Sequence, residues 1–127
     1  MLKTAHDLVV AAKATITEVS PQEAQALLGT TVTLVDVREP HEYQAGHLAD
    51  AINVPRGMLE FMLPNQPGCQ DAGVPLLLYC KTSGRAALAA QSLQSLGYTA
   101  VKSMAGGFDA WVAAGLPVVK PGEASFD

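Results

Sequence analysis

The sequence predicts a single α/β domain with a largely parallel sheet, and three observations carry this prediction. Short apolar runs alternate with segments of helical spacing along the 127 residues. The run at 75–79 is almost continuously apolar, as expected for a strand buried on both faces of a parallel sheet. Gly and Pro separate most of these segments. A chain of this length suits one domain.

Two helix starts are predicted from their capping residues. Thr4 followed by Asp7 resembles a capping box and predicts a first helix over about 5–14. Ser20 at the N-cap, Pro21 at the first helical position and Glu23 two residues later predict a second helix. Gly29 is expected to end that second helix, since glycine is the usual residue beyond a helix C-terminus.

The other elements follow from short apolar runs and from helical spacing between glycines. The predicted strands are 16–19, 32–37, 51–54, 75–79 and 98–102, and the predicted helices are 41–45, 57–63, 83–96 and 107–114. Residues 64–73 contain two Pro and two Gly and are expected to form a loop. Residues 16–119 are predicted to form the domain, with 1–15 as a helical extension and 120–127 as a tail.

The charge balance argues against nucleic acid as the main partner. Lys and Arg number 8 against 12 Asp and Glu, which gives a formal net charge of −4 without a basic cluster. No apolar stretch reaches the ~20 residues of a membrane span. The first residues also lack the long apolar run and cleavage site of a secretory signal. We therefore expect a cytoplasmic protein with no membrane partner.

The chain has only two cysteines, Cys69 and Cys80, which is too few for a disulfide scaffold. Thiols stay reduced in the cytoplasm, so each cysteine is considered first as a possible reagent. The sequence contains no His-Glu-x-x-His, Cys-x-x-Cys, Gly-x-Gly-x-x-Gly or Walker A pattern. Neither a metal nor a nucleotide cofactor is therefore expected.

Chemistry-bearing residues follow three predicted strands, at 36–39, 80–85 and 103–107. Sites in parallel α/β folds lie beyond the carboxyl ends of strands. The segment at 80–85 is the most informative, because Cys80 directly follows the buried run and a helix begins shortly after it. Loop N–H groups and the helix N-terminus favour an anion there, and Lys81 and Arg85 add full positive charges. Such surroundings favour a thiolate over a thiol, so Cys80 is predicted to be a nucleophile inside an anion-binding loop.

Motifs in four regions, in the same order along the chain, resemble those of the rhodanese family of sulfurtransferases. They are Cys-x4-Arg at 80–85, Val-Asp-Val-Arg-Glu-Pro at 35–40 with Glu-Tyr-x-x-Gly-His-Leu at 42–48, Ala-Ile-Asn-Val-Pro at 51–55, and Gly-Gly-Phe-x-x-Trp at 106–111 with Gly-Leu-Pro-Val at 115–118. The resemblance covers roughly residues 16–119 and leaves the first predicted helix outside. It implies a rhodanese-like three-layer fold, with a mostly parallel five-stranded sheet between helices.

The resemblance also implies a reaction, transfer of a sulfane sulfur through a persulfide on Cys80. The thiolate would take the outer sulfur of thiosulfate or a similar anion, and cyanide, a small thiol or a protein thiol would accept it. No cofactor is implied, because the covalent intermediate divides the transfer into two easier displacements.

The neighbouring residues receive supporting roles in this reading. Lys81 and Arg85 are expected to contact the sulfonate of the donor, and Thr82 and Ser83 to supply hydroxyls and backbone donors. Gly84 is expected to allow a backbone conformation that other residues resist. Two further residues, Asp36 and Arg38, are expected to shape the site from the neighbouring strand. With Lys81 and Arg85, Arg38 would make the pocket locally positive.

Two other functions remain open. A carrier or partner-binding rhodanese module would hold sulfur without turning over small donors. A phosphatase or arsenate reductase is less favoured, because the related cell-cycle phosphatases have a loop one residue longer, Cys-x5-Arg, that admits phosphate. The physiological donor and acceptor and the oligomeric state are not specified by the sequence.

Several other residues receive structural roles. His47 is predicted to hydrogen-bond within its loop, and Trp111 and Phe108 to pack in the core. Cys69 is predicted to be a bystander, with a role as a resolving thiol left open if its loop folds over Cys80. The first helix could pack on its own domain or on a partner subunit.

Overall fold

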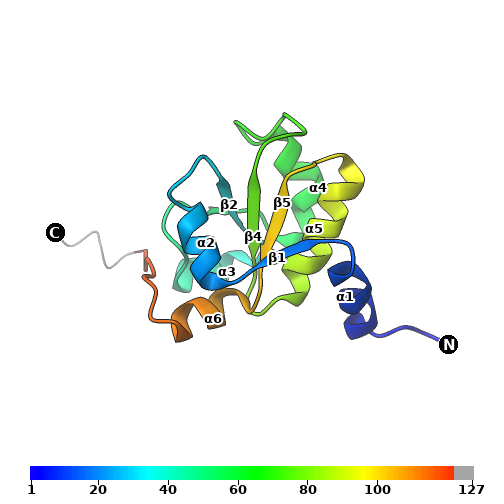
Figure 1. Ribbon diagram of the computed structural model, residues 1–127, viewed down its shortest axis with the longest axis horizontal. Coiled ribbons are helices and arrows are strands. Elements are labelled where there is room, and N and C mark those ends of the chain that lie inside the picture. The colour runs from blue at the N-terminus through cyan, green and yellow to red at the C-terminus, as the bar shows by residue number, and fades with distance from the viewer. Residues whose placement is uncertain (122–127) are drawn as a thin grey trace.

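Figure 1 shows the computed structural model of the chain, which describes residues 1–121. Five strands form one sheet in the order β1-β5-β4-β2-β3, and every neighbouring pair is parallel. The strands are β1 Thr17–Val19, β2 Thr33–Asp36, β3 Ile52–Asn53, β4 Leu76–Tyr79 and β5 Val101–Met104. The predicted α/β fold with a five-stranded parallel sheet is thus confirmed.

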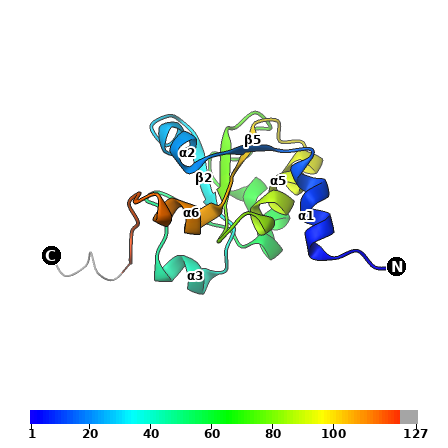
Figure 2. The same cartoon turned by 60° about the horizontal axis from the view of Figure 1, so that its bottom comes forward.

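Helices cover both faces of the sheet and complete three layers. They are α1 Ala5–Lys13, α2 Pro21–Leu27, α3 Pro40–Ala45, α4 Leu59–Met62, α5 Gly84–Leu96 and α6 Gly107–Ala113. In Figures 1 and 2, α1 and α5 lie side by side on one face, whereas α2 and α6 lie on the other. Two 3-10 turns, Arg56–Met58 and Leu63–Asn65, flank α4.

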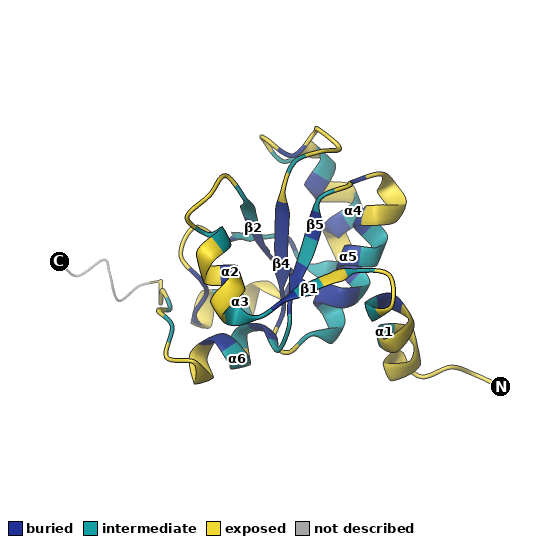
Figure 3. Ribbon diagram, viewed as in Figure 1, coloured by how far each residue is buried: buried dark blue, intermediate teal, exposed yellow. Residues whose placement is uncertain are grey.

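The central strand β4 supplies side chains to both halves of the core. Leu76 and Leu78 pack in the cluster that contains the buried alanines of α5. Leu77 and Tyr79 pack on the opposite face with Trp111 of α6. All four residues of β4 are buried, as the dark strand in Figure 3 shows, which confirms the strand predicted from the apolar run. The predicted core position of Trp111 is also confirmed.

Both predicted capping boxes are present. The Thr4 hydroxyl accepts the Asp7 N–H at 3.1 Å, and the Asp7 carboxylate accepts the Thr4 N–H at 2.9 Å. Ser20 and Glu23 repeat this arrangement at the start of α2, at 3.1 and 2.9 Å. These pairs satisfy amides that have no partner within the helix, so the helix starts are set by local sequence.

The predicted strand at 98–102 is displaced, since β5 runs from Val101 to Met104. The chain after α5 is used to close that helix instead. Gly97 has a left-handed φ of 115°, and the Tyr98 N–H donates to the Leu93 carbonyl at 3.1 Å. Ser103 therefore lies within the strand, where it is fully buried, rather than in a loop beyond it.

Helix α1 packs against α5 of its own domain and buries Ala12. Leu8 and Val10 remain about half exposed. At the other end of the described chain, Val119 forms an antiparallel bridge with His47. Most of the predicted tail, residues 122–127, lies outside the described residues.

Candidate active site around Cys80

Cys80 follows β4 directly and lies where the chain turns toward α5. Its side chain is 1% exposed, and its Sγ accepts the N–H of Ala86 at 3.3 Å. Ala86 is the third residue of α5, so this donor is one of the helix amides without a partner inside the helix. The sulfur therefore lies at the positive end of a 13-residue helix.

The first residues of α6 hold the backbone of the Cys80 loop in place. The Phe108 N–H donates to the Cys80 carbonyl at 2.8 Å, and the Asp109 N–H donates to the Lys81 carbonyl at 3.0 Å. A Cβ added to Gly107 would lie only 2.3 Å from the Thr82 carbonyl oxygen. The two backbones are thus too close for any side chain at 107, which explains the glycine in the third predicted segment.

Each charged residue of the loop has an acidic partner. Lys81 Nζ lies 2.7 Å from the Asp109 carboxylate, in a pair that is largely exposed. Arg85 makes two hydrogen bonds to the Glu42 carboxylate of α3, at 2.7 and 3.0 Å. The expected excess of positive charge is therefore balanced locally, and a bound anion would compete with these carboxylates.

Thr82 and Ser83 form the exposed turn of the loop, and Gly84 opens α5. Thr82 is exposed, whereas Ser83 is half-buried and its Oγ accepts a hydrogen bond from Lys13 at 2.8 Å. The expectation for Gly84 is wrong, because it is the first residue of a right-handed helix and does not have a positive φ. A Cβ there would meet only Val9 of α1, at 3.4 Å, an ordinary packing distance.

The Arg85 pair shifts the ionisation of both partners. The hydrogen bonds from Arg85 lower the pKa of Glu42 to about 2 from its ordinary 4.5, despite partial burial. The same bonds raise the pKa of Arg85, and the nearby Cys80 adds a smaller effect in the same direction. Arg85 thus links α3 electrostatically to the cysteine loop.

We expect this pair to give a pH-dependent contribution to the free energy of unfolding. Because the folded pKa of Glu42 is about 2, below its ordinary 4.5, the stabilisation is complete above pH 4.5 and disappears as pH falls toward 2. Urea unfolding at several pH values should show Glu42→Gln less stable than the unmodified protein at neutral pH, with the difference narrowing below pH 4.5. Asp109→Asn, which breaks the exposed Lys81 pair, should cost much less, because water screens that pair. An equal difference at every pH would contradict this assignment.

The supporting residues Asp36 and Arg38 form a buried ion pair at the end of β2. The Asp36 carboxylate accepts from the Arg38 backbone N–H at 2.9 Å and from its guanidinium at 2.8–3.1 Å. Burial alone would lower the pKa of Arg38, but the hydrogen bonds and charge of Asp36 outweigh burial and raise it. The guanidinium also donates to the Gly46 carbonyl at 2.7 Å and lies over the Phe108 ring, 4.3 Å from its centroid.

This pair reaches the cysteine through Phe108, whose N–H holds the Cys80 carbonyl. Asp36 and Arg38 are thus linked to the Cys80 loop through Phe108. Tyr79 completes the cluster, and burial together with the Asp36 charge raises the pKa of its hydroxyl. The spacing of residues in the sequence could not reveal this series of contacts from Arg38 to Cys80, because it depends on α6 lying beside the end of β2.

Cys69 lies far from this site. It is fully buried, its carbonyl accepts the Tyr98 hydroxyl, and burial raises the pKa of its thiol. Tyr98 follows the C-terminus of α5, whereas Cys80 lies at its N-terminus, and a helix of 13 residues is about 20 Å long. The loop therefore does not fold over Cys80, and the resolving-thiol hypothesis has no support in this arrangement.

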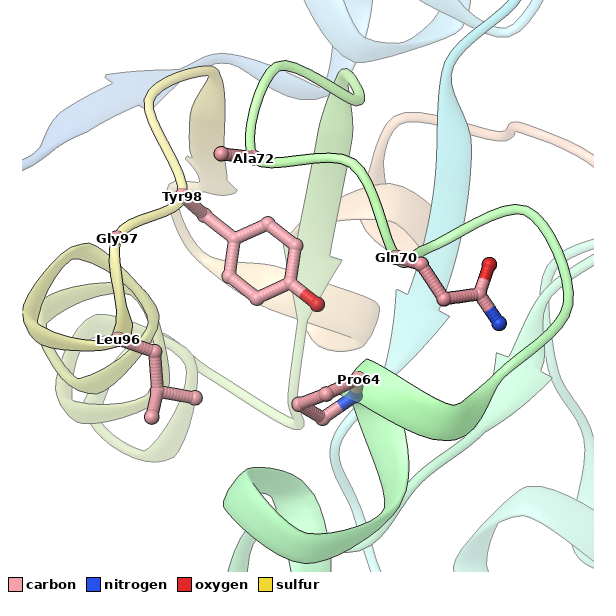
Figure 4. Close-up of a pocket in the computed structure, with 6 residues that line it drawn as sticks. All are labelled: Pro64, Gln70, Ala72, Leu96, Gly97 and Tyr98. Carbon is pink, nitrogen blue, oxygen red and sulfur yellow. The ribbon is translucent and has the colours of Figure 1, made fainter.

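A pocket of about 300 Å³ lies near the same far end of α5. Figure 4 shows Tyr98 reaching from the chain after α5 toward Pro64, with Gln70 and Ala72 on the opposing loop. No cysteine is among its lining residues. The pocket therefore does not belong to the Cys80 site.

His47 has structural contacts. Its Nδ1 lies 3.0 Å from the Tyr43 carbonyl, and its ring stacks on the Tyr43 ring at 3.7 Å. Within residues 1–121, no group of three or more His, Cys, Asp or Glu side chains is arranged to hold a metal ion. No helix in that part of the chain is long and apolar enough to span a membrane.

The motifs, the fold and the cysteine loop define a member of a known family. Residues 20–114 match the rhodanese-like domain, and the chain belongs to this family. Among curated relatives, a sulfurtransferase of Allochromatium vinosum is 31% identical over 84% of this chain and 97% of its own length. A thiosulfate sulfurtransferase GlpE of Actinobacillus pleuropneumoniae is 32% identical over 82% of this chain and 94% of its own.

Another relative is longer. An uncharacterized protein of a Synechocystis strain is 43% identical over 70% of this chain, and the match spans 48% of that protein. The chain thus spans about half the length of this relative.

Solved structures give the same family. The human single-domain sulfurtransferase TSTD1 superposes with a TM-score of 0.70 at 30% identity, over 76% of this chain and 95% of that one. A protein of unknown function from Rhodopseudomonas palustris, named a possible tyrosine phosphatase, superposes with a TM-score of 0.85 at 30% identity, over 94% and 96% of the two chains. The last superposition covers nearly the whole of this chain.

Proposed function

We propose that this chain transfers a sulfane sulfur from thiosulfate or a similar small anion through a persulfide on Cys80. The observation that carries the proposal is the Cys80 sulfur, which accepts an amide from the α5 N-terminus inside a Cys-x4-Arg loop. Residues 16–119 would act as one rhodanese domain, with 1–15 as a helical extension and 120–127 as a tail. A cytoplasmic location, where thiols stay reduced, suits this chemistry.

The proposed reaction has two displacements. The Cys80 thiolate attacks the outer sulfur of thiosulfate, an S–S bond forms, and sulfite leaves with the electron pair of the broken S–S bond. An acceptor thiolate or cyanide then attacks the terminal sulfur of the persulfide, and the Cys80 thiolate is released. Cys80 begins and ends the cycle as a thiolate, so the protein gains and loses no electrons overall. The reaction therefore requires no redox cofactor.

The site supports a small, terminal sulfur atom as the reacting group. Cys80 is almost fully buried, so only a narrow group can approach its sulfur without movement of the loop. The Ala86 N–H that reaches the thiolate could also stabilise a persulfide anion. Lys81 and Arg85 are proposed contacts for the donor sulfonate, but they must first loosen their bonds to Asp109 and Glu42.

The proposal predicts that Cys80 is essential for turnover. Purified protein should convert thiosulfate and cyanide to thiocyanate and sulfite, and Cys80→Ser should reduce the rate to that of the solution without enzyme. The intact mass should rise by one sulfur atom after thiosulfate treatment and return after a reducing thiol. Cys69→Ser is the matched control and should keep the mass change, because Cys69 is remote and buried. Full turnover by Cys80→Ser would refute the mechanism.

Two further outcomes separate the other functions. A persulfide that forms but is passed only to one protein thiol, with negligible thiocyanate production, would identify a sulfur carrier. Hydrolysis of an aryl phosphate that depends on Cys80 would identify a phosphatase, the activity suggested by the name of the Rhodopseudomonas relative.

A further inference from the structure

Helix α5 begins without the serine cap that its sequence offers. In α2, the N-cap Ser20 accepts the N–H of the third helical residue, Glu23, at 3.1 Å. Ser83 occupies the same N-cap position of α5 but makes no such bond. The third-residue amide of α5, that of Ala86, donates to the Cys80 sulfur instead. In α5 the sulfur thus accepts the amide that corresponds to the one accepted by the serine hydroxyl in α2.

The Ser83 hydroxyl is engaged elsewhere, by a residue of the first helix. Lys13, the last residue of α1, donates from Nζ to Ser83 Oγ at 2.8 Å. The backbone of Ser83 also differs from that of an ordinary cap, with φ −152° and ψ −16°, whereas Ser20 has −72° and 164°.

The position of Lys13 is itself fixed by several contacts. Glu18 of β1 lies 3.7 Å from Nζ, α1 packs along α5, and Val9 adjoins Gly84. The Lys13 side chain is about one-third exposed, so it is partly shielded from competing water.

We infer that Lys13 is a positioning residue for Cys80: by holding the Ser83 hydroxyl away from the cap position, it leaves the Ala86 amide to the sulfur. The N-terminal helix, which precedes the matched family region at 20–114, would thus tune the reactive thiol without touching it. This inference deepens the proposed function and rests on it, since it treats Cys80 as the reacting group.

A double-mutant cycle tests the inference with a readout that needs no sulfur donor. The rate of Cys80 alkylation by iodoacetamide is measured by peptide mass mapping in the full chain, and the Ala86 amide signal is followed by NMR. Lys13→Met should slow alkylation about tenfold, as expected when a charged acceptor loses a hydrogen bond, and should move the Ala86 signal. In the Ser83→Ala background the same Lys13→Met change should alter the rate by less than about twofold, because no hydroxyl remains to compete.

The outcomes distinguish this inference from other roles of Lys13. A tenfold loss that persists in the Ser83→Ala background would mean that Lys13 acts by charge or by anchoring α1, and would overturn the inference. An unchanged rate and an unmoved Ala86 signal in Lys13→Met would also overturn it. Lys3→Met, which removes an exposed lysine of the same end of the chain, is the matched control and should leave both readouts unchanged. Failure of the proposed function would appear separately, as absence of the persulfide mass increment with the alkylation cycle intact.

Discussion

Gly107→Ala is expected to abolish sulfur transfer and to lower the free energy of unfolding by roughly 3 kcal/mol. The new Cβ would lie 2.3 Å from the Thr82 oxygen and 2.4 Å from the Cys80 oxygen. Both neighbours are backbone atoms, so no flexible side chain can move aside. Gly107 also has a left-handed φ of 57°, which an alanine adopts only with strain. To relieve the clash, α6 must withdraw from the loop and give up its bonds to the Cys80 and Lys81 carbonyls.

Gly115→Ala is the matched control for this prediction. Gly115 also has a positive φ, 75°, but apart from Gly115 and its two chain neighbours no residue has an atom within 4 Å of the position that its Cβ would take. The free energy of unfolding of this variant should therefore fall only by the cost of an alanine at positive φ, about 1 kcal/mol. Its activity should be kept. Urea unfolding and the thiosulfate assay measure both effects. If the two variants behave alike, the close approach of α6 to the cysteine loop is not what positions Cys80.

The sequence predicted best those features that depend on neighbours along the chain. The capping boxes at Thr4 and Ser20 each join residues three apart, so their outcome hardly depends on the rest of the fold. The buried strand β4 was equally predictable from the sequence, because a small α/β domain has few other places for a continuous apolar run. The position of Cys80 at the end of that strand followed directly.

Contacts between distant segments were not predictable in the same way. Arg85 pairs with Glu42, 43 residues away, and Lys13 reaches Ser83 across 70 residues. The sequence indicated that positive charge gathers at the loop, but not which carboxylates would balance it, because helix packing selects those partners. Glu42 lies within the motif at 42–48 that resembles the rhodanese family, and this was the one signal in the sequence that pointed to Glu42. The displaced start of β5 has a local origin instead, since Gly97 and the Tyr98 N–H close α5 before the strand begins.

Asp36→Asn is expected to destabilise the fold by about 3–5 kcal/mol, the usual cost of leaving one member of a buried ion pair without its partner. Asp36 is fully buried, and Arg38 is only 4% exposed. The asparagine would remove the negative charge and would place an amide donor beside a guanidinium that has only donors. Arg38 would then keep the Gly46 carbonyl and the Phe108 ring as partners, and neither carries a full charge.

The control for this prediction is a pair of apolar variants. Replacing a buried ion pair by apolar residues of similar size often costs less than breaking it, so Asp36→Leu with Arg38→Met should be more stable than Asp36→Leu alone. Urea unfolding gives the three free energies, and thiosulfate turnover per folded molecule gives the effect on the site. Since Arg38 lies over the rings of Phe108 and Tyr79 and reaches Cys80 through these residues, the double variant should retain part of the turnover that Cys80→Ser loses entirely. Complete loss of turnover in a well-folded double variant would instead make Arg38 a direct participant in sulfur transfer.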